Sequence, residues 1–135
     1  MAKIRKIDHV AIVVPDIKNA LAFWQEALGL ELHHVEDVPS QKALVAFLPT
    51  GESEIELVKP TTEDTGAARF LNDRGPGMHH LCFEVDDLEG MLDNLKSKGI
   101  RLINEVPLQL EGRRMAFIHP KSACGVLVEL YEIDS

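Results

Sequence analysis

Apolar residues follow two patterns along this chain, and both patterns occur twice. An alternating pattern typical of a half-buried strand places every second residue on one face: Val10, Ile12 and Val14, then Leu81, Phe83 and Val85. A stripe with the helical spacing i, i+3, i+4, i+7 follows each strand: Ile17, Ala20, Leu21 and Trp24, then Leu88, Met91, Leu92 and Leu95. The chain therefore contains two copies of one strand–helix segment.

The two copies also begin and end their helices alike. Asp16 and Asp87 stand where an N-cap belongs, and Gly29 and Gly99 are stop signals after the last periodic residues. Three strand-like runs then follow in each half, at residues 29–35, 42–49 and 53–60, and at residues 100–106, 113–120 and 125–132. Each half is thus predicted to be a βαβββ module.

The modules span about residues 4–60 and 77–133, and residues 61–76 have the composition of a short helical connector. Half of the chain, about 65 residues, buries its apolar surface poorly alone. We therefore predict one domain over residues 1–135, of the α+β class, in which two tandem βαβββ modules pack together.

Composition narrows the possible partners and compartments. The chain has 135 residues, 45% of them hydrophobic, and its net charge of −8 comes without a dense basic block, which disfavours nucleic acid and anionic membranes as partners. The N-terminus lacks the apolar segment of a secretory signal, so we expect a cytoplasmic protein. Reduced thiols are the default there, and Cys82 is expected to be a small buried hydrophobe.

The repeat singles out four polar residues. His80 aligns with His9, and Glu129 aligns with Glu56. Alternation along the strands turns all four away from the helix-packed face. A carboxylate in the middle of an apolar strand is costly to bury unless it is paired, hydrogen-bonded or bound to a cation. One histidine and one glutamate per half make a plausible ligand set for a divalent metal.

Plainer interpretations exist for each of these residues. A single histidine near a strand start is more often a hydrogen-bonded core residue, and a mid-strand glutamate is more often exposed to solvent. Their coincidence at equivalent places favours metal binding. The other histidines, by contrast, are expected to pack or hydrogen-bond without binding metal: His33, His34, His79 and His119.

On these residues the chain resembles the vicinal oxygen chelate superfamily, also named for glyoxalase, bleomycin resistance proteins and dioxygenases. The resemblance runs from IDHVAIVV through GMHHLCFEVDDL to HPKSACGVLVEL. The turn at His119–Ser122 is similar to that of the methylmalonyl-CoA epimerases, whereas glyoxalase I relatives usually have an Asp-Pro-Asp-Gly type of turn there. The resemblance implies the glyoxalase-like fold, in which two tandem βαβββ modules form a curved sheet that encloses a metal, with the metal ligands on the end strands of each module.

The resemblance also implies an activity, namely interconversion of (R)- and (S)-methylmalonyl-CoA through a metal-stabilised enolate. It implies a homodimer, an acyl-CoA substrate and a divalent ion, with Co²⁺ or Mn²⁺ favoured over Ni²⁺, Fe²⁺ or Zn²⁺. His9, Glu56, His80 and Glu129 would be the metal ligands. Glu129 and Glu56 are also our candidates for proton transfer, because strand 42–49, where some epimerases carry a base, contains no acid.

Other residues near the last strands are candidates for substrate binding. Lys121, Arg113 and Arg114 offer positive charge for the phosphates of coenzyme A, and Ser122 offers a hydroxyl for a carboxylate or carbonyl. For each of these, an ordinary surface or turn role is the alternative.

Two other functions stay open from the sequence. A lactoylglutathione lyase of the glyoxalase I type uses the same kind of ligand set and the same proton-transfer logic. A metal-free module that binds a small molecule uses the same fold, although it predicts loss of the ligand residues.

Overall fold

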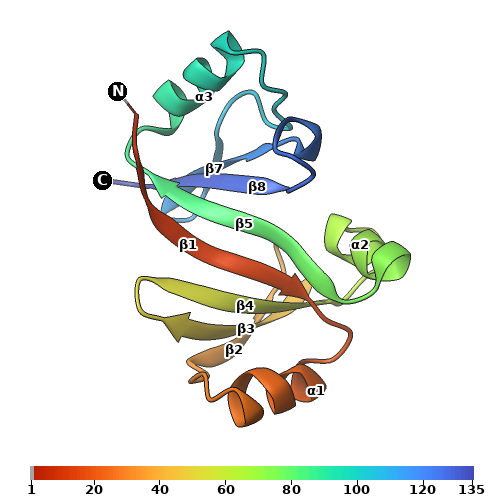
Figure 1. Cartoon of the computed structure of the whole chain (residues 1–135). Helices are drawn as coiled ribbons and strands as arrows, with labels where there is room; N and C mark the ends of the chain where they lie inside the picture. Colours follow the sequence, from red (N-terminus) through yellow and green to blue (C-terminus); the bar gives the residue numbers. More distant parts are fainter. Residues whose placement is uncertain (1) are drawn as a thin grey trace. The chain divides into compact units, whose positions relative to one another are not determined.

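The computed structural model describes residues 2–135 (Figure 1). The elements in chain order are β1 (Ile4–Val13), α1 (Ile17–Leu21), the π-helix η1 (Ala22–Ala27), β2 (His34–Val38), β3 (Ala43–Thr50), β4 (Ser53–Pro60), α2 (Gly66–Arg74), β5 (Gly77–Val85), α3 (Leu88–Ser97), β6 (Leu108–Leu110), β7 (Arg113–Ile118), the 3₁₀ helix η2 (Pro120–Ser122) and β8 (Val128–Ile133). This order confirms the two βαβββ modules, with α2 as the helical connector.

Contacts divide the chain into two compact units. One unit is His9–His79, and the other combines residues 2–8 with His80–Ser135. The first residues of β1 therefore belong with the second module. That the two modules form a single domain stays a prediction. Within residues 2–135, no helix is long and apolar enough to cross a membrane.

In the His9–His79 unit, the strands lie in the order β2-β3-β4-β1. β1 and β4 run parallel, and the other neighbours run antiparallel. Figure 1 shows α1 against the strands of this unit. Ile12, Leu48 and Leu57 form the core under the helix, with Trp24 packed against it, whereas Ala11 and Val58 lie in a separate cluster. The two clusters correspond to the two faces of the sheet.

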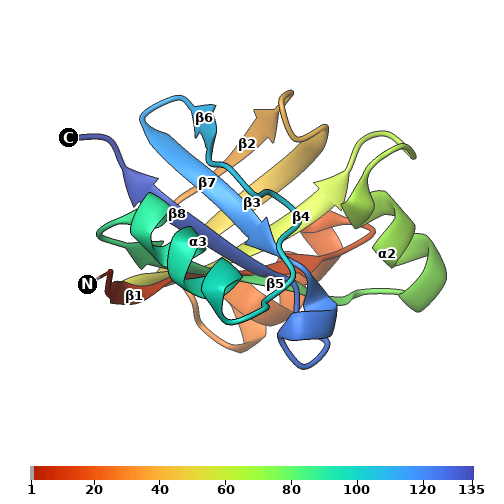
Figure 2. The same ribbon diagram turned by 90° about the horizontal axis from the view of Figure 1, so that it is seen from above.

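The unit that contains His80–Ser135 repeats this arrangement. Its strands lie in the order β5-β8-β7-β6, with β6 at the edge (Figure 2). Under α3, the core contains Val85, Leu92 and Leu130. The second cluster contains Cys82 and Tyr131. Cys82 is fully buried, as expected.

The predicted helix boundaries are confirmed. The Asp16 carboxylate accepts a hydrogen bond from the Asn19 amide at 2.9 Å, and Asp87 caps Gly90 in the same way at 3.0 Å. The first helix, however, changes to π-helical geometry at Ala22. Its apolar stripe still packs on the sheet.

Two predicted strands were wrong in extent. In the run 29–35, strand pairing begins only at His34, because Leu30 and Leu32 pack into the core under the helix. In the run 100–106, only Leu102 forms an isolated bridge, to Ile118. The short strand that pairs with the start of β7 is instead β6, which begins at Leu108.

A side-chain hydrogen bond explains why the run 100–106 forms no regular strand. The Asn104 side-chain oxygen accepts the Phe117 amide at 2.8 Å. The Phe117 carbonyl in turn accepts the amide of Ile103 at 2.9 Å and that of Asn104 at 3.3 Å. Because a side chain takes a ladder position, regular pairing with β7 is interrupted here.

Candidate functional site

His9 and Glu56 form a buried pair in the His9–His79 unit. Glu56 lies opposite Ala11 in the parallel register of β1 and β4, so that His9 is its diagonal neighbour. The His9 Nδ1 atom is 3.3 Å from the Glu56 Oε2 atom, and the two side chains are only 4% and 13% exposed. The pair lies on the sheet face away from α1, as the alternation predicts.

His80 and Glu129 form the equivalent pair in the other unit. Glu129 lies opposite Cys82 in the parallel register of β5 and β8. The His80 Nε2 atom is 3.2 Å from the Glu129 Oε1 atom, and the side chains are 14% and 7% exposed. An edge-to-face contact with Phe117, with 5.8 Å between ring centroids, orients the His80 ring.

The two pairs share further local structure. Phe47 lies directly opposite Glu56 on the neighbouring antiparallel strand, and Phe117 lies directly opposite Glu129. An aromatic ring beside each carboxylate lowers the local dielectric, which strengthens any electrostatic interaction of that carboxylate. Each unit thus offers one imidazole nitrogen and one carboxylate oxygen from largely buried side chains. Such donors suit first-row divalent metals.

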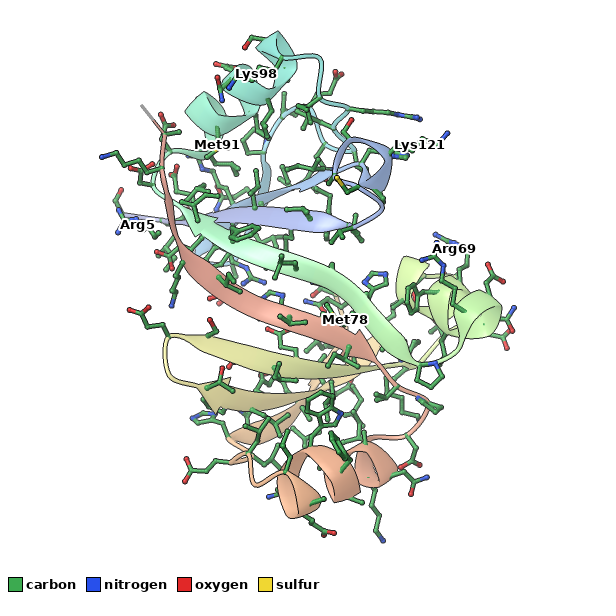
Figure 3. All side chains as sticks on the ribbon, in the orientation of Figure 1. Arg5, Arg69, Met78, Met91, Lys98 and Lys121 are labelled. Atoms are coloured by element: carbon green, nitrogen blue, oxygen red, sulfur yellow. The ribbon has the colours of Figure 1, made fainter. Side chains whose placement is uncertain are left out.

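The candidate substrate-binding residues of the second unit have different surroundings. The Ser122 hydroxyl oxygen accepts the Arg101 amide at 2.8 Å, which leaves its proton available to a ligand. Lys121 is exposed on η2, and its side chain projects outward (Figure 3). Arg113 lies over the ring of Tyr131, with 5.2 Å to the centroid.

Arg114, by contrast, forms two ion pairs. Its guanidinium lies 2.9 Å from the Glu89 carboxylate on α3 and 2.7 Å from that of Glu132. These contacts with Glu132, then with Glu89, raise the pKa of Arg114. Arg114 therefore links α3 to β8, which argues against its expected role in substrate binding.

Two of the other histidines, His79 and His119, lie in ordinary contacts of their own units. His79 makes an edge-to-face contact with Phe70 at 5.4 Å between centroids. The His119 Nδ1 atom accepts the Lys121 amide at 3.0 Å. Partial burial, and then the charges of Arg101 and Lys121, lower the pKa of His119.

Sequence reasoning missed a polar cluster around Tyr131. The Tyr131 hydroxyl lies 2.6 Å from an Asp8 carboxylate oxygen, to which it donates, and 3.2 Å from a Glu84 oxygen. Arg5 lies 3.8 Å from Glu84, and Lys6 lies 4.0 Å from Asp8. Burial, followed by the hydrogen bond to Asp8, raises the pKa of Tyr131. The available signal was that Tyr131 and Glu84 share the strand faces of Glu129 and His80.

Replacing Tyr131 by phenylalanine is expected to lower the free energy of unfolding by about 1–3 kcal/mol at neutral pH, because Asp8 loses its hydroxyl donor. The ring under Arg113 is retained, so the change isolates the hydroxyl. The pKa of Tyr131 is raised above the 10.0 of a free tyrosine. Its contribution is therefore complete below pH 10 and decreases as the pH rises toward the folded-state pKa.

Urea unfolding of both proteins at pH 7 and above pH 10 measures this effect. Tyr131 is the only tyrosine in the chain, so tyrosinate absorbance reports its ionisation directly. Equal unfolding free energies at pH 7 would contradict the assignment of a stabilising hydrogen bond.

Comparison with known proteins assigns the family. Residues 8–117 match the family model of the glyoxalase/bleomycin resistance protein/dioxygenase superfamily. Human mitochondrial methylmalonyl-CoA epimerase is 39% identical over 127 residues, which are 93% of this chain and 72% of that protein. This chain belongs to the methylmalonyl-CoA epimerase family of that superfamily.

Solved structures of the epimerase family agree with this placement. The crystal structure of methylmalonyl-CoA epimerase from Mycobacterium tuberculosis has a TM-score of 0.85 and 38% identity, covering 98% of this chain and 90% of that one. A methylmalonyl-CoA epimerase in complex with methylmalonyl-CoA and NH4+ has a TM-score of 0.86 and 30% identity, covering 98% and 97%. The predicted glyoxalase-like fold is confirmed, and a divalent metal is consistent with this superfamily.

Proposed function

We propose that this protein is an epimerase that interconverts (R)- and (S)-methylmalonyl-CoA. The observation that carries the proposal is the buried histidine–glutamate pair, which occurs once in each unit on equivalent strands. Membership of the epimerase family supplies the reaction. A plain solvated sheet face requires neither the burial nor the repetition of these pairs.

The reaction requires proton transfer at one carbon atom. In methylmalonyl-CoA the α-carbon lies between a thioester carbonyl and a carboxylate, and its proton must leave one face and return to the other. We propose that the ligands of the divalent ion are His9, Glu56, His80 and Glu129. When bound, such an ion would supply Lewis-acid stabilisation of the charge that develops on the thioester group when the α-proton leaves.

We propose Glu129 and Glu56 as the groups that exchange the proton. Both are largely buried carboxylates, each within 3.3 Å of an imidazole of its own unit. The neighbouring strand β3 offers no acidic side chain as an alternative. The imidazole nitrogen at this distance can donate a hydrogen bond to the ionised carboxylate, which only accepts, and this helps to hold the carboxylate in position.

We further propose that Lys121, Ser122 and Arg101 bind the substrate near one end of β7. Arg113, also a candidate, lies at the other end of that strand, since it pairs with Ile133 whereas Ile118 pairs with Val128. The His119 amide donates to the Arg101 carbonyl at 2.9 Å, and Ser122 accepts the Arg101 amide. Among residues 2–135, no carboxylate lies within 4.0 Å of the charged groups of Arg101 or Lys121. Unpaired cations in an acidic protein suit the phosphates of coenzyme A.

Arg101→Gln is expected to raise the KM for methylmalonyl-CoA about 10-fold, because one charge-assisted contact to phosphate is lost. The KM for methylmalonyl-pantetheine, which lacks these phosphates, should not change. Steady-state kinetics with both thioesters measure the difference.

Lys98→Gln is the matched control, since it removes an exposed cation of the same unit that lies well apart from Lys121 in Figure 3. An equal rise in KM for both thioesters in Arg101→Gln would remove Arg101 from phosphate binding.

The nature of the ion and the assembly are finer predictions. We expect Co²⁺ or Mn²⁺, because both accept mixed imidazole and carboxylate ligands and the family resemblance favours them. A homodimer and a cytoplasmic location are expected from the same resemblance. Metal analysis of the purified protein tests the identity of the ion, and light scattering tests the homodimer.

The decisive experiment is an exchange assay in deuterated water. Wild-type protein should incorporate deuterium at the α-carbon of methylmalonyl-CoA, and a chelator should abolish this exchange. The same protein should not convert methylglyoxal plus glutathione. Turnover of the glutathione adduct without exchange in methylmalonyl-CoA would support a lactoylglutathione lyase instead. Ligand binding without any turnover would indicate a binding module.

A further inference from the structure

Two exposed histidines at the start of β2 lie with their rings in contact. His33 and His34 are sequence neighbours, and neighbours in a strand normally point to opposite faces. Here the two Nδ1 atoms are 2.6 Å apart, and the ring centroids are 4.8 Å apart at 74°. Each ring therefore directs its Nδ1 atom toward the same point.

Two contacts fix the ring of His34. It stacks on Phe47, its cross-strand partner, with 4.5 Å between centroids and 17° between planes. Its Nε2 atom lies 3.2 Å from a Glu36 carboxylate oxygen. A carboxylate only accepts, so Nε2 carries the proton and Nδ1 presents a lone pair toward His33. A carboxylate behind a histidine is the arrangement that orients metal-binding imidazoles.

We propose that His33 and His34 bind a transition-metal ion such as Cu²⁺ or Zn²⁺ through their Nδ1 atoms, with Glu36 as the positioning carboxylate of His34. Metal–nitrogen bonds are about 2.0–2.1 Å long, so two imidazole ligands of one ion stand about 2.9–3.4 Å apart. The rings need to open by less than about 1 Å to admit the ion. Water completes the coordination sphere, since the His34 and Glu36 side chains are 43% and 54% exposed.

This site is separate from the His9–Glu56 pair of the same unit. His34 lies opposite Phe47, and Phe47 lies opposite Glu56. Two strand spacings, about 10 Å, therefore separate the His34 backbone from the Glu56 backbone. The Phe47 ring stands between the two sets of ligands. Binding at His33 and His34 thus does not depend on the ligands proposed for the epimerase reaction.

Titration with Cu²⁺, followed by isothermal calorimetry and electron paramagnetic resonance, tests the proposal. Wild-type protein should bind one more ion per chain than His33→Ala or His34→Ala, and the spectrum of that ion should show coupling to two nitrogens. His119→Ala is the matched control and should bind as many ions as the wild type. Equal numbers of ions in the wild type and in His33→Ala would overturn the proposal.

Glu36→Ala provides a second test that leaves both ligands in place. Loss of such a positioning carboxylate typically lowers metal affinity about 10- to 100-fold. We expect that loss at this ion alone, with the two-nitrogen coupling retained. An unchanged affinity would contradict the role of Glu36. None of these measurements uses epimerase activity, so their outcome does not depend on whether the proposed function is correct.

Discussion

Replacing His80 by alanine is expected to lower kcat for methylmalonyl-CoA epimerisation by about 10³-fold, together with a loss of bound divalent metal. A Lewis acid contributes several kcal/mol to the stabilisation of charge next to the α-carbon, and about 4 kcal/mol corresponds to that factor. The change also removes the imidazole that lies 3.2 Å from Glu129. His9→Ala should have an equivalent effect, since His9 holds the same position beside Glu56.

Metal analysis and kinetics on the same preparations measure both effects. His119→Ala is the control for metal content, because His119 belongs to the same unit and is not a proposed ligand; its Nδ1 atom accepts the Lys121 amide. His80→Gln preserves most of the side-chain volume and separates loss of the ligand from loss of packing. Full activity of His80→Ala, with the metal content of the wild type, would contradict the assignment of His80 as a metal ligand.

Exchanging a carboxylate for an amide is expected to have the second largest effect. Glu129→Gln and Glu56→Gln should each lower deuterium incorporation at the α-carbon by about 10²- to 10⁴-fold, the range that a positioned acid or base contributes. Glutamine keeps the shape and a ligand oxygen but does not accept the proton. If the two residues serve opposite faces, each variant should slow exchange in one stereoisomer more than in the other.

Exchange with each pure stereoisomer, followed by mass spectrometry, measures this. Metal content must be determined in parallel, since both residues are also proposed ligands. Unaltered exchange in both variants, with metal still bound, would exclude both from proton transfer. Another group would then have to be the base, which strand β3 does not supply.

The repeated apolar pattern predicted most of the fold, because the spacing of apolar residues indicates both the kind of element and the face that it buries. Ile17 and Leu88 begin equivalent helices, and the carboxylates of Asp16 and Asp87 cap them. The π-helical turn at Ala22 was beyond such reasoning, since the same apolar stripe packs on the sheet in either helical form. The interruption at Asn104 depends on one side-chain hydrogen bond, which no periodicity encodes.

The histidine–glutamate pairs were predictable for a related reason. Strand alternation and the repeat together placed His9 with Glu56 and His80 with Glu129 on the faces away from the helices. The Tyr131 cluster was not predictable, because Asp8 reaches Tyr131 across 123 positions of sequence. The contact between His33 and His34 was also missed, since alternation predicts that these neighbouring rings diverge.

The discontinuous unit constrains the order in which the chain can fold. Residues 2–8 belong with His80–Ser135, and Lys3 hydrogen-bonds to Asp86, 83 positions away. During synthesis, Asp86 and the rest of the second module emerge from the ribosome only after the whole His9–His79 segment. Contacts of such long range slow folding, because loop-closure entropy is lost before they form. The His9–His79 segment, by contrast, contains β2, β3, β4 and the second half of β1, so it can begin to assemble first.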